Sequence, residues 1–345
     1  MSTQIHTRSG KDVQASWQKV EGEGPLLEVD QLTTSFKVHR GSLQAVNGVS
    51  FTVSRGETIG IVGESGSGKS QILMSLMGLL PQNGKATGSV KLGGEEILGL
   101  PRDKLNKIRG TRMSMVFQDP MTALNPYLKI GRQLTEVLTF HRHISESEAR
   151  GHARAMLEQV HIPEPARRLD QYPHELSGGM RQRVMIAMGM LCRPGLLLAD
   201  EPTTALDVTI QAEILDLLAE QQQIQGTAII LVTHDLGVVA RLCDRVIVLY
   251  GGRIVEQGPA QDIFYDPQHP YTRGLLMSMP RLDDDLTSEL PAIGGQPPDL
   301  AHMPPGCAFA PRCAYVQDSC LSAVPPLRHI SPVRLKACTR DELVA

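Results

Sequence analysis

The sequence predicts an α/β fold in which helices cover a parallel β-sheet core, followed by a separate, loop-rich C-terminal segment. Three observations support this prediction. Short, near-continuous apolar runs alternate with helical stretches, which is typical of parallel sheets buried on both faces. One apolar run leads into a glycine-rich turn at residues 63–70 and then into a helix. After residue 265 the composition changes, because the last 80 residues hold 12 of the 23 prolines and four of the six cysteines.

Hydrophobic periodicity predicts the elements of the N-terminal third. Residues 1–24 are polar and form a tail with no expected element. Residues 26–36 and 43–51 alternate apolar and polar side chains, which predicts half-buried antiparallel strands. Residues 58–62 form an apolar run that predicts a buried strand, and residues 71–80 predict the helix after the glycine-rich turn.

The later elements are predicted in the same way. Apolar runs predict four further strands, at residues 113–117, 196–199, 228–233 and 246–250. Helical patterns cover residues 120–190 and residues 211–225. Residues 266–345 are expected to form an appendix rather than more of the same sheet.

Length, charge and hydropathy limit the classes of function. A chain of 345 residues is long enough for about two domains. A net charge of -3, a pI of 6.4 and 4% aromatic residues give no sign of nucleic-acid binding. No apolar run approaches the length of a membrane span, and the N-terminus has no signal-peptide pattern. We therefore expect a cytoplasmic chain whose role at a membrane is peripheral and depends on partners.

The glycine-rich turn matches the phosphate-binding pattern G-x-x-x-x-G-K-[ST]. Its glycines let backbone N–H groups turn towards an anion, and the next helix directs its N-terminus at the same point. Lys69 supplies a charge for the β- and γ-phosphates, and Ser70 offers a hydroxyl to Mg²⁺. The candidate phosphate-binding residues are Gly63, Glu64, Ser65, Gly66, Ser67, Gly68, Lys69 and Ser70.

Two acids, Asp200 and Glu201, follow the apolar run at residues 196–199. At the carboxyl end of a strand, Asp200 can hold Mg²⁺ beside the phosphate loop, and Glu201 can orient or polarise the attacking water. An acid pair after a strand is by itself more often a solvated turn. Its position downstream of a complete phosphate loop favours the catalytic interpretation.

A second glycine motif precedes these acids. Ser177 can cap a helix that runs to Met190, and Gly178 and Gly179 leave the first helical amides bare. These residues form a second candidate anion site at a helix N-terminus, although an ordinary capped helix explains them equally well.

The order of the motifs resembles that of the ATP-binding cassette (ABC) ATPases. After the phosphate loop come Gln118, the Leu-Ser-Gly-Gly signature at residues 176–179, Asp200-Glu201, Ala205-Leu206-Asp207 and His234. The resemblance implies a P-loop ABC nucleotide-binding domain over residues 25–265, with a parallel-sheet core, an antiparallel β subdomain and an α-helical subdomain at about residues 120–190. A Pro/Cys-rich C-terminal extension would occupy residues 266–345.

The resemblance also implies a two-subunit ATP site. Ser177, Gly178 and Gly179 would contact the γ-phosphate of ATP held by the opposite subunit. Asp207 would lie at the seam between the subunits, which is compatible with its capping a helix.

Three further residues take roles from the resemblance at the nucleotide itself. Gln118 would sense Mg²⁺ and the attacking water and link the site to a membrane partner. Without the resemblance, the sequence would favour an ordinary amide at the end of a strand. His234 would touch the γ-phosphate and help to hold the water. Phe36 would stack on the adenine, although it is equally a candidate core residue of its strand.

Several stretches resemble the ATPase subunits of dipeptide and oligopeptide importers. They lie at residues 118–126, 172–176 and 266–272, the last followed by Leu275-Leu276. This resemblance implies ATP-driven import of di- and oligopeptides, with the chain peripheral at the cytoplasmic face of the inner membrane. The implied partners are a second ATPase subunit, often a different chain, two transmembrane permease subunits and an extracytoplasmic peptide-binding protein.

Alternatives to peptide import remain open from the sequence. Nickel importers share much of this pattern, so the cargo could be nickel or another small solute. An ABC ATPase acting on DNA or ribosomes would show two cassettes, a long coiled coil or basic and aromatic patches, and none is visible. A cassette that binds ATP without hydrolysis is disfavoured, because the catalytic residue types are all present.

Cys307, Cys313, Cys320 and Cys338 form a loosely spaced cluster near the C-terminus. Disulfides are not expected in the cytoplasm, and the spacing is looser than that of most zinc sites. Free thiols, zinc and a [4Fe–4S] cluster are the alternatives. The extension resembles that of dipeptide/oligopeptide ATPase subunits, some of which carry such a cluster, and this favours [4Fe–4S]. The other two cysteines, Cys192 and Cys243, are expected to be packed core thiols.

Overall fold

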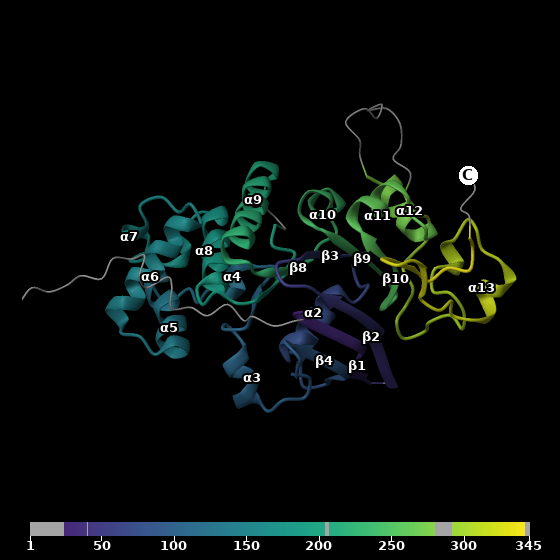
Figure 1. Cartoon of the computed structure of the whole chain (residues 1–345), viewed down its shortest axis with the longest axis horizontal. Coiled ribbons are helices and arrows are strands. Elements are labelled where there is room, and N and C mark those ends of the chain that lie inside the picture. Colours follow the sequence, from purple (N-terminus) through teal and green to yellow (C-terminus); the bar gives the residue numbers. More distant parts are fainter. Residues whose placement is uncertain (1–23, 40, 204–206, 280–291, 342–345) are drawn as a thin grey trace, which may run out of the picture.

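The computed structural model describes residues 24–39, 41–203, 207–279 and 292–341 (Figure 1). The expected tail at residues 1–24 lies outside this description except for its last residue, and so do Ala205 and Leu206. None of the described helices is long and apolar enough to cross a membrane.

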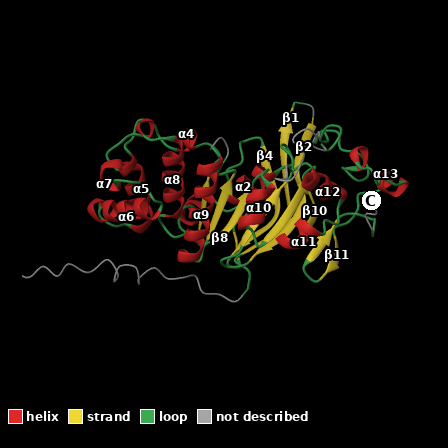
Figure 2. Ribbon diagram, turned by 90° about the horizontal axis from the view of Figure 1, so that it is seen from above, coloured by secondary structure: helices red, strands yellow, loops and turns green. Residues whose placement is uncertain are grey.

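An eight-stranded mixed sheet forms the centre of the molecule (Figure 2). Four consecutive parallel pairings join β6 to β7, β7 to β8, β8 to β3 and β3 to β9, and the remaining pairings are antiparallel. From one edge to the other, the strands are β6 (Met113–Val116), β7 (Leu196–Asp200), β8 (Ala228–Val232), β3 (Thr58–Val62), β9 (Arg245–Tyr250), β10 (Arg253–Pro259), β12 (Arg334–Lys336) and β11 (Arg328–Ser331).

A second, antiparallel sheet of four strands packs over the helix that follows β3. That helix, α2 (Lys69–Met77), lies between the two sheets (Figure 1). A hydrogen bond of 2.7 Å between the hydroxyls of Thr34 and Ser75 ties this sheet to α2. In order across the sheet, the strands are β2 (Gly41–Val53), β1 (Leu27–Val38), β4 (Gly84–Leu92) and β5 (Glu95–Glu96).

Helices between β6 and β7 form a lobe at one end of the molecule (Figure 1). They are α4 (Pro120–Ala123), α5 (Ile130–Arg142), α6 (Glu146–Gln159), α7 (Pro165–Arg168), the short 3₁₀-helix η1 (Pro173–Glu175) and α8 (Gly178–Met190). The other helices are α3 (Arg102–Ile108), α9 (Val208–Gln225), α10 (Leu236–Leu242), α11 (Ala260–Tyr265), α12 (Pro270–Met277), η2 (Ala310–Arg312) and α13 (Asp318–Ser322).

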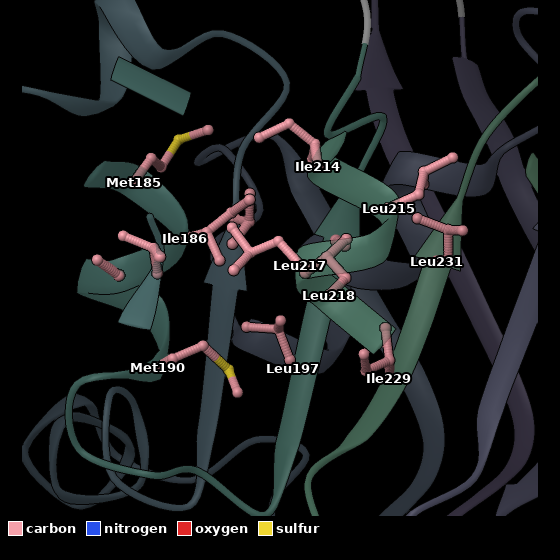
Figure 3. Close-up of a cluster of buried hydrophobic side chains, with 14 of the residues drawn as sticks. Met185, Ile186, Met190, Leu197, Ile214, Leu215, Leu217, Leu218, Ile229 and Leu231 are labelled. Carbon is pink, nitrogen blue, oxygen red and sulfur yellow. The ribbon is translucent and has the colours of Figure 1, made fainter. Parts of the chain in front are cut away.

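Alternation along the parallel strands separates two hydrophobic cores. Leu197 and Ile229 face α8 and α9 and pack against residues such as Ile186 and Leu218 (Figure 3). Their neighbours in sequence, such as Leu196 and Ile230, face α2 and the antiparallel sheet. Both faces are therefore apolar, which explains why these strands read as continuous apolar runs in the sequence.

The expected strands and helices of the first 250 residues are present. The antiparallel strands, the strand and helix around the glycine-rich turn, the helical lobe and the later parallel strands all form within a few residues of the expected positions. Within these residues the pattern missed the more polar strand β4, the two-residue strand β5 and the short helices α3 and α10, and just beyond them it missed β10.

The expectation that the C-terminal segment stands apart from the sheet is wrong. Strand β12 pairs antiparallel with β10, with Glu256 opposite Lys336, and β11 extends the same sheet. Hydrophobic periodicity does not predict β12, because its buried residues Arg334 and Lys336 are charged and are held by polar contacts.

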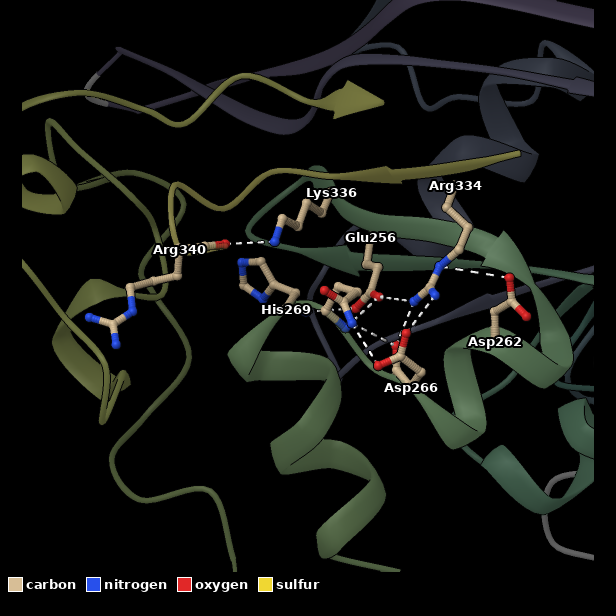
Figure 4. A network of polar contacts seen from close by, with 8 residues as sticks. Glu256, Asp262, Asp266, His269, Arg334, Lys336 and Arg340 are labelled. Carbon is tan, nitrogen blue, oxygen red and sulfur yellow. Dashed lines mark hydrogen bonds and ion pairs between the residues drawn. The ribbon is translucent and has the colours of Figure 1, made fainter. Parts of the chain in front are cut away.

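A buried polar network holds these edge strands (Figure 4). The Glu256 carboxylate has no exposed surface and accepts the backbone N–H groups of Gln268 and His269 at 2.7 and 2.9 Å. Arg334 approaches Glu256 at 3.6 Å and donates to Asp266 at 2.9 Å. One carboxylate thus joins β10, β12 and the start of α12, and its satisfied hydrogen bonds make the burial tolerable.

We expect acid to weaken the fold through His269. Burial, with Lys336 nearby, lowers the pKa of His269 to about 3, while the unfolded imidazole titrates near 6.5. Since the unfolded state binds the extra proton between these values, this group alone removes about 2 kcal/mol of stability between pH 7 and pH 5.

The measurement is urea unfolding at both pH values for the wild type and for His269→Asn, which keeps an acceptor for the Tyr271 N–H. Burial raises the pKa of Glu256, which acts in the opposite sense and is common to both proteins. The variant should lose less stability on acidification. An equal loss in the two proteins would contradict the assignment.

Candidate functional site

The candidate site lies along one edge of the central sheet, where the parallel strands end. Gln118 follows β6, Asp200 ends β7, His234 follows β8 and Gly63 follows β3. These strands are neighbours in the order β6-β7-β8-β3, so residues far apart in sequence meet at adjacent strand ends. Ligands of open α/β sheets bind at this carboxyl edge.

Two glycines give the phosphate loop its shape. Gly63 and Gly68 have φ values of 153° and 103°, a region that favours glycine. A Cβ at Gly63 would lie 2.2 Å from the Leu249 carbonyl oxygen, and one at Gly68 would lie 2.3 Å from the Ala45 carbonyl oxygen. The loop therefore packs directly on the backbones of β9 and β2, which fixes the start of α2.

The start of α2 leaves polar groups available for an anion. No side chain caps the helix, so its first amides have no side-chain acceptor. The Ser67 hydroxyl is buried and has no hydrogen-bond partner among the described residues. Buried donors of this kind cost free energy unless a ligand satisfies them, which fits a phosphate-binding cradle.

Lys69 lies inside this cradle. Its ammonium donates to the carbonyl oxygens of Gly63 and Glu64 at 2.7 and 3.0 Å, and the residue is 6% exposed. Burial lowers the pKa of Lys69, while the carboxylates of Glu201, Asp200 and Glu64 act in the opposite direction. A phosphate anion at this point would supply the counter-charge that favours the ammonium form.

Ser70 and Asp200 place two oxygen donors together beside the loop. The Ser70 hydroxyl donates to Asp200 Oδ1 at 2.9 Å. Burial raises the pKa of Asp200, and the Ser70 hydrogen bond partly opposes this. A hydroxyl and a buried carboxylate form the hard-oxygen pair that Mg²⁺ prefers, and a divalent cation would offset the burial of the carboxylate, so the residues present fit this ion.

Glu201 is held between the ends of the two neighbouring strands. Gln118 Nε2 donates to Glu201 Oε2 at 3.0 Å, and His234 Nδ1 lies 3.4 Å from Glu201 Oε1. The backbone of Glu201 adopts a φ of 45° at the turn after β7, and its N–H donates to the Val232 carbonyl at 2.9 Å. A carboxylate fixed in this way can accept a proton from a bound water.

The other expected ATP-site residues are not brought to the phosphate loop. Ser177 caps α8 by accepting the Met180 N–H at 3.3 Å, and Asp207 caps α9 by accepting the Ile210 N–H at 2.9 Å. Ser177, Gly178 and Asp207 are exposed. No hydrogen bond or ion pair among the described residues joins them to the loop, which is compatible with their expected contact to a second subunit.

Phe36 lies at the other end of α2 from the loop. A Cβ at Gly84 would lie 2.8 Å from the Phe36 ring and 3.2 Å from Leu80, which follows the C-terminus of α2. Adenine stacking by Phe36 therefore stays a prediction that this placement does not strengthen.

The four C-terminal cysteines line one small cavity, together with residues that include His269 and Arg340. Burial raises the pKa of Cys307 and of Cys313, which disfavours free thiolates. Over the described ranges, no group of three or more His, Cys, Asp or Glu side chains is arranged to hold a metal ion. The structure therefore gives no support to the expected iron–sulfur cluster or to zinc beyond the shared cavity.

Sequence reasoning missed two residues that touch the phosphate loop from the C-terminal segment. The Tyr271 hydroxyl accepts the Glu64 N–H at 2.8 Å, and Arg312 pairs with the Glu64 carboxylate. Tyr271 lies in the stretch at residues 266–272 that the sequence analysis singled out, but no pattern gave it or Arg312 a role at the loop, since the contacts span more than 200 residues of sequence.

Comparisons with known proteins agree with this geometry. A family model described as "ABC transporter" matches residues 46–204, and one described as "Oligopeptide/dipeptide transporter, C-terminal region" matches residues 255–320. The oligopeptide transport ATP-binding protein OppD of Salmonella typhimurium is 55% identical over 313 residues, which cover 91% of this chain and 93% of that protein. The dipeptide transport ATP-binding protein DppD of Bacillus subtilis is 54% identical over 290 residues, or 84% and 86% of the two chains.

Solved structures share the fold of the nucleotide-binding part. The ATP-binding cassette MJ0796, solved as a dimer in a post-hydrolysis state with ADP and Pi, matches with a TM-score of 0.62 and 31% identity, covering 68% of this chain and 98% of that chain. The structure of cbiO1 from Clostridium perfringens matches with a TM-score of 0.60 and 30% identity, covering 71% and 92%.

Alanine substitutions at two glycines of the phosphate loop should distinguish two costs in unfolding free energy: the strain of a positive φ, and the steric overlap of a new Cβ with a neighbouring backbone. A Cβ at Gly66 meets nothing within 4 Å, so Gly66→Ala should cost only the strain of its positive φ, about 1–2 kcal/mol. A Cβ at Gly68 overlaps the Ala45 carbonyl, so Gly68→Ala should cost at least about 3 kcal/mol and move the start of α2. Chemical unfolding measures both costs, and equal losses would contradict the packing described.

Proposed function

We infer that this chain, which belongs to the family of ABC transporter ATPases that carry the oligopeptide/dipeptide transporter C-terminal region, is the ATP-hydrolysing subunit of a peptide importer. One observation carries this inference. The same chain contains a complete phosphate loop with its acid pair and a C-terminal region that matches the peptide-transporter family.

Peptide as the cargo rests on the relatives. The chain is more than half identical to oligopeptide and dipeptide transport ATP-binding proteins over most of both chains. A subunit of this kind works with membrane permease subunits and a substrate-binding protein. We propose that it binds peripherally at the cytoplasmic face of the inner membrane, through the permeases and the region after Gln118.

We propose that ATP binds with its β- and γ-phosphates in the loop. The glycine-loop amides, Lys69 and the unpaired Ser67 hydroxyl would contact the phosphates, and the Ser70 hydroxyl and Asp200 would hold Mg²⁺. Mg²⁺ would neutralise charge that develops on the phosphate oxygens. The site then needs positioning and charge stabilisation more than covalent chemistry.

Glu201 is our candidate for the catalytic base. Its carboxylate would accept a proton from the attacking water as the oxygen of that water bonds to the γ-phosphorus. The bond from the γ-phosphorus to the bridging oxygen then breaks, and ADP leaves with that bonding electron pair. The fixed positions of Gln118 and His234 on the two carboxylate oxygens support this role, because they orient Glu201 from both sides.

We further propose that the site is completed by a second ATPase subunit, often a different chain in this branch of the family. The exposure of Ser177 and Gly178 at the bare start of α8 supports this, since a helix N-terminus can bind the γ-phosphate of ATP on the other subunit. Asp207 would lie near the same seam.

We also propose a [4Fe–4S] cluster at the four cysteines. Their common cavity supports this, although no arrangement for a single metal ion is found among the described residues. A cluster holds its four thiolates farther apart than one zinc ion does, and binding would favour the thiolate form that burial otherwise disfavours.

Glu201→Gln should retain ATP binding and lose turnover. The amide keeps the shape of the carboxylate but cannot accept a proton, so kcat for ATP should fall at least about 100-fold. ATPase assays of the transporter assembled with its partner subunits and nucleotide titration of the purified chain measure the two effects. Asp103→Asn, at an exposed acid of α3, is the matched control and should hydrolyse ATP at the wild-type rate. Hydrolysis by Glu201→Gln near that rate would exclude Glu201 as the base.

Anaerobically purified protein should contain iron and labile sulfide, and Cys313→Ser should lose both. Cys243→Ser, at a buried thiol outside the cavity, should keep them. Metal and sulfide analysis of the three proteins is the measurement. Stoichiometric zinc without iron, or no metal at all, would refute the cluster.

A further inference from the structure

The phosphate loop contains a carboxylate that is neutralised from the C-terminal segment. Arg312 Nη1 and Nη2 lie 2.6 and 2.9 Å from the two carboxylate oxygens of Glu64. The Arg312 side chain is 4% exposed and that of Glu64 is 25% exposed. A two-pronged pair of this kind is stronger and more directional than an exposed ion pair.

The guanidinium of Arg312 is fixed on every side. Its Nε donates to the Gly294 carbonyl at 2.8 Å, Nη1 also reaches the Tyr250 hydroxyl at 3.2 Å, and Nη2 also reaches the Ile293 carbonyl at 3.1 Å. All five N–H groups therefore have an acceptor. A guanidinium stays charged at physiological pH, so Arg312 brings a permanent positive charge to Glu64.

The C-terminal segment also forms a hydrogen bond with the backbone of the phosphate loop. Tyr271 accepts the Glu64 N–H at 2.8 Å, and its ring packs on Tyr250, with ring centres 4.4 Å apart. Phe309, three residues before Arg312, completes this cluster against both rings. Tyr250 ends β9, the parallel strand next to β3, so the C-terminal segment occupies the next place along the edge that carries the site.

The charge of the Arg312–Glu64 pair affects how well the loop can bind a nucleotide. An unpaired Glu64 carboxylate would stand in the loop that must receive a polyphosphate, and like charges in a partly buried site repel strongly. Arg312 removes that repulsion and holds the carboxylate turned towards the C-terminal segment. Lys69, whose ammonium lies in the same loop beside the Gly63 and Glu64 carbonyl oxygens, would then pair with the phosphates rather than with the Glu64 carboxylate.

We propose that Arg312 is a positioning residue of the ATP site: by pairing with Glu64, it sets the charge and conformation of the phosphate loop, so that the C-terminal segment controls nucleotide affinity. This inference rests on the proposed binding of ATP at the loop. It gives the C-terminal segment a role in the ATP site that the proposed function does not assign to it, and Phe309 of the same contact also lines the cysteine cavity.

The test is a double-mutant cycle on the full chain, with the affinity for a non-hydrolysable ATP analogue and Mg²⁺ measured by calorimetry. Arg312→Gln should weaken binding at least about tenfold, because it leaves Glu64 uncompensated. Adding Glu64→Gln to the same chain should recover most of that loss. Arg328→Gln, in the same segment but paired with Asp341, is the matched control and should bind as the wild type does.

Salt dependence supplies a second measurement that a merely structural defect would not change. The affinity of Arg312→Gln should improve relative to the wild type as salt screens the uncompensated carboxylate. Arg312→Lys keeps the positive charge but loses the two-pronged geometry, and it replaces Arg312→Gln if that variant does not fold. It should bind the analogue more weakly than the wild type does, and adding Glu64→Gln should again recover the affinity.

Unchanged affinity in a folded Arg312 variant, or a loss that Glu64→Gln does not recover, would overturn the proposal. Failure of the wild type itself to bind the analogue would instead refute ATP binding at the loop, so the two failures are distinguishable.

Discussion

Parallel pairing of β6, β7, β8, β3 and β9 is the constraint on which the site depends. Because these strands run the same way and lie in this order, their carboxyl ends form one row. Gln118, Glu201 and His234 come from three strands of that row, and the phosphate loop comes from the fourth. Two apolar cores hold the strands in register, so the positions of these polar side chains follow from packing on both faces of the sheet.

The parallel core and most of its site could be predicted from the sequence, because both arise from local patterns. Strands buried on two faces read as apolar runs, and residues that follow such runs must meet at one edge. The Ser70–Asp200 hydrogen bond and the arrangement of Gln118, Glu201 and His234 agree with the chemistry expected of these residue types. The contact of Ser177, Gly178 and Gly179 with a nucleotide lies beyond a single chain and stays a prediction.

The C-terminal segment could not be predicted in the same way, because polar contacts between distant residues build it. Strand β12 is only three residues long, and buried charges of Arg334 and Lys336 hold it rather than an apolar face. The Arg312–Glu64 pair joins residues 248 positions apart, and nothing near either residue in sequence indicates the other. The prolines and cysteines marked a change of composition correctly, but not the return of the chain to the sheet and to the phosphate loop.

Uptake of a labelled pool of di- to oligopeptides by the native cell tests the central claim most directly. Cells that carry either the wild-type chain or Glu201→Gln would be compared, with expression and ATP binding of the variant checked in parallel. The account predicts that uptake is lost with Glu201→Gln, since a site that binds ATP without hydrolysing it cannot complete the transport cycle. Unchanged uptake with an expressed, ATP-binding variant would contradict peptide import and indicate nickel or another small solute as the cargo.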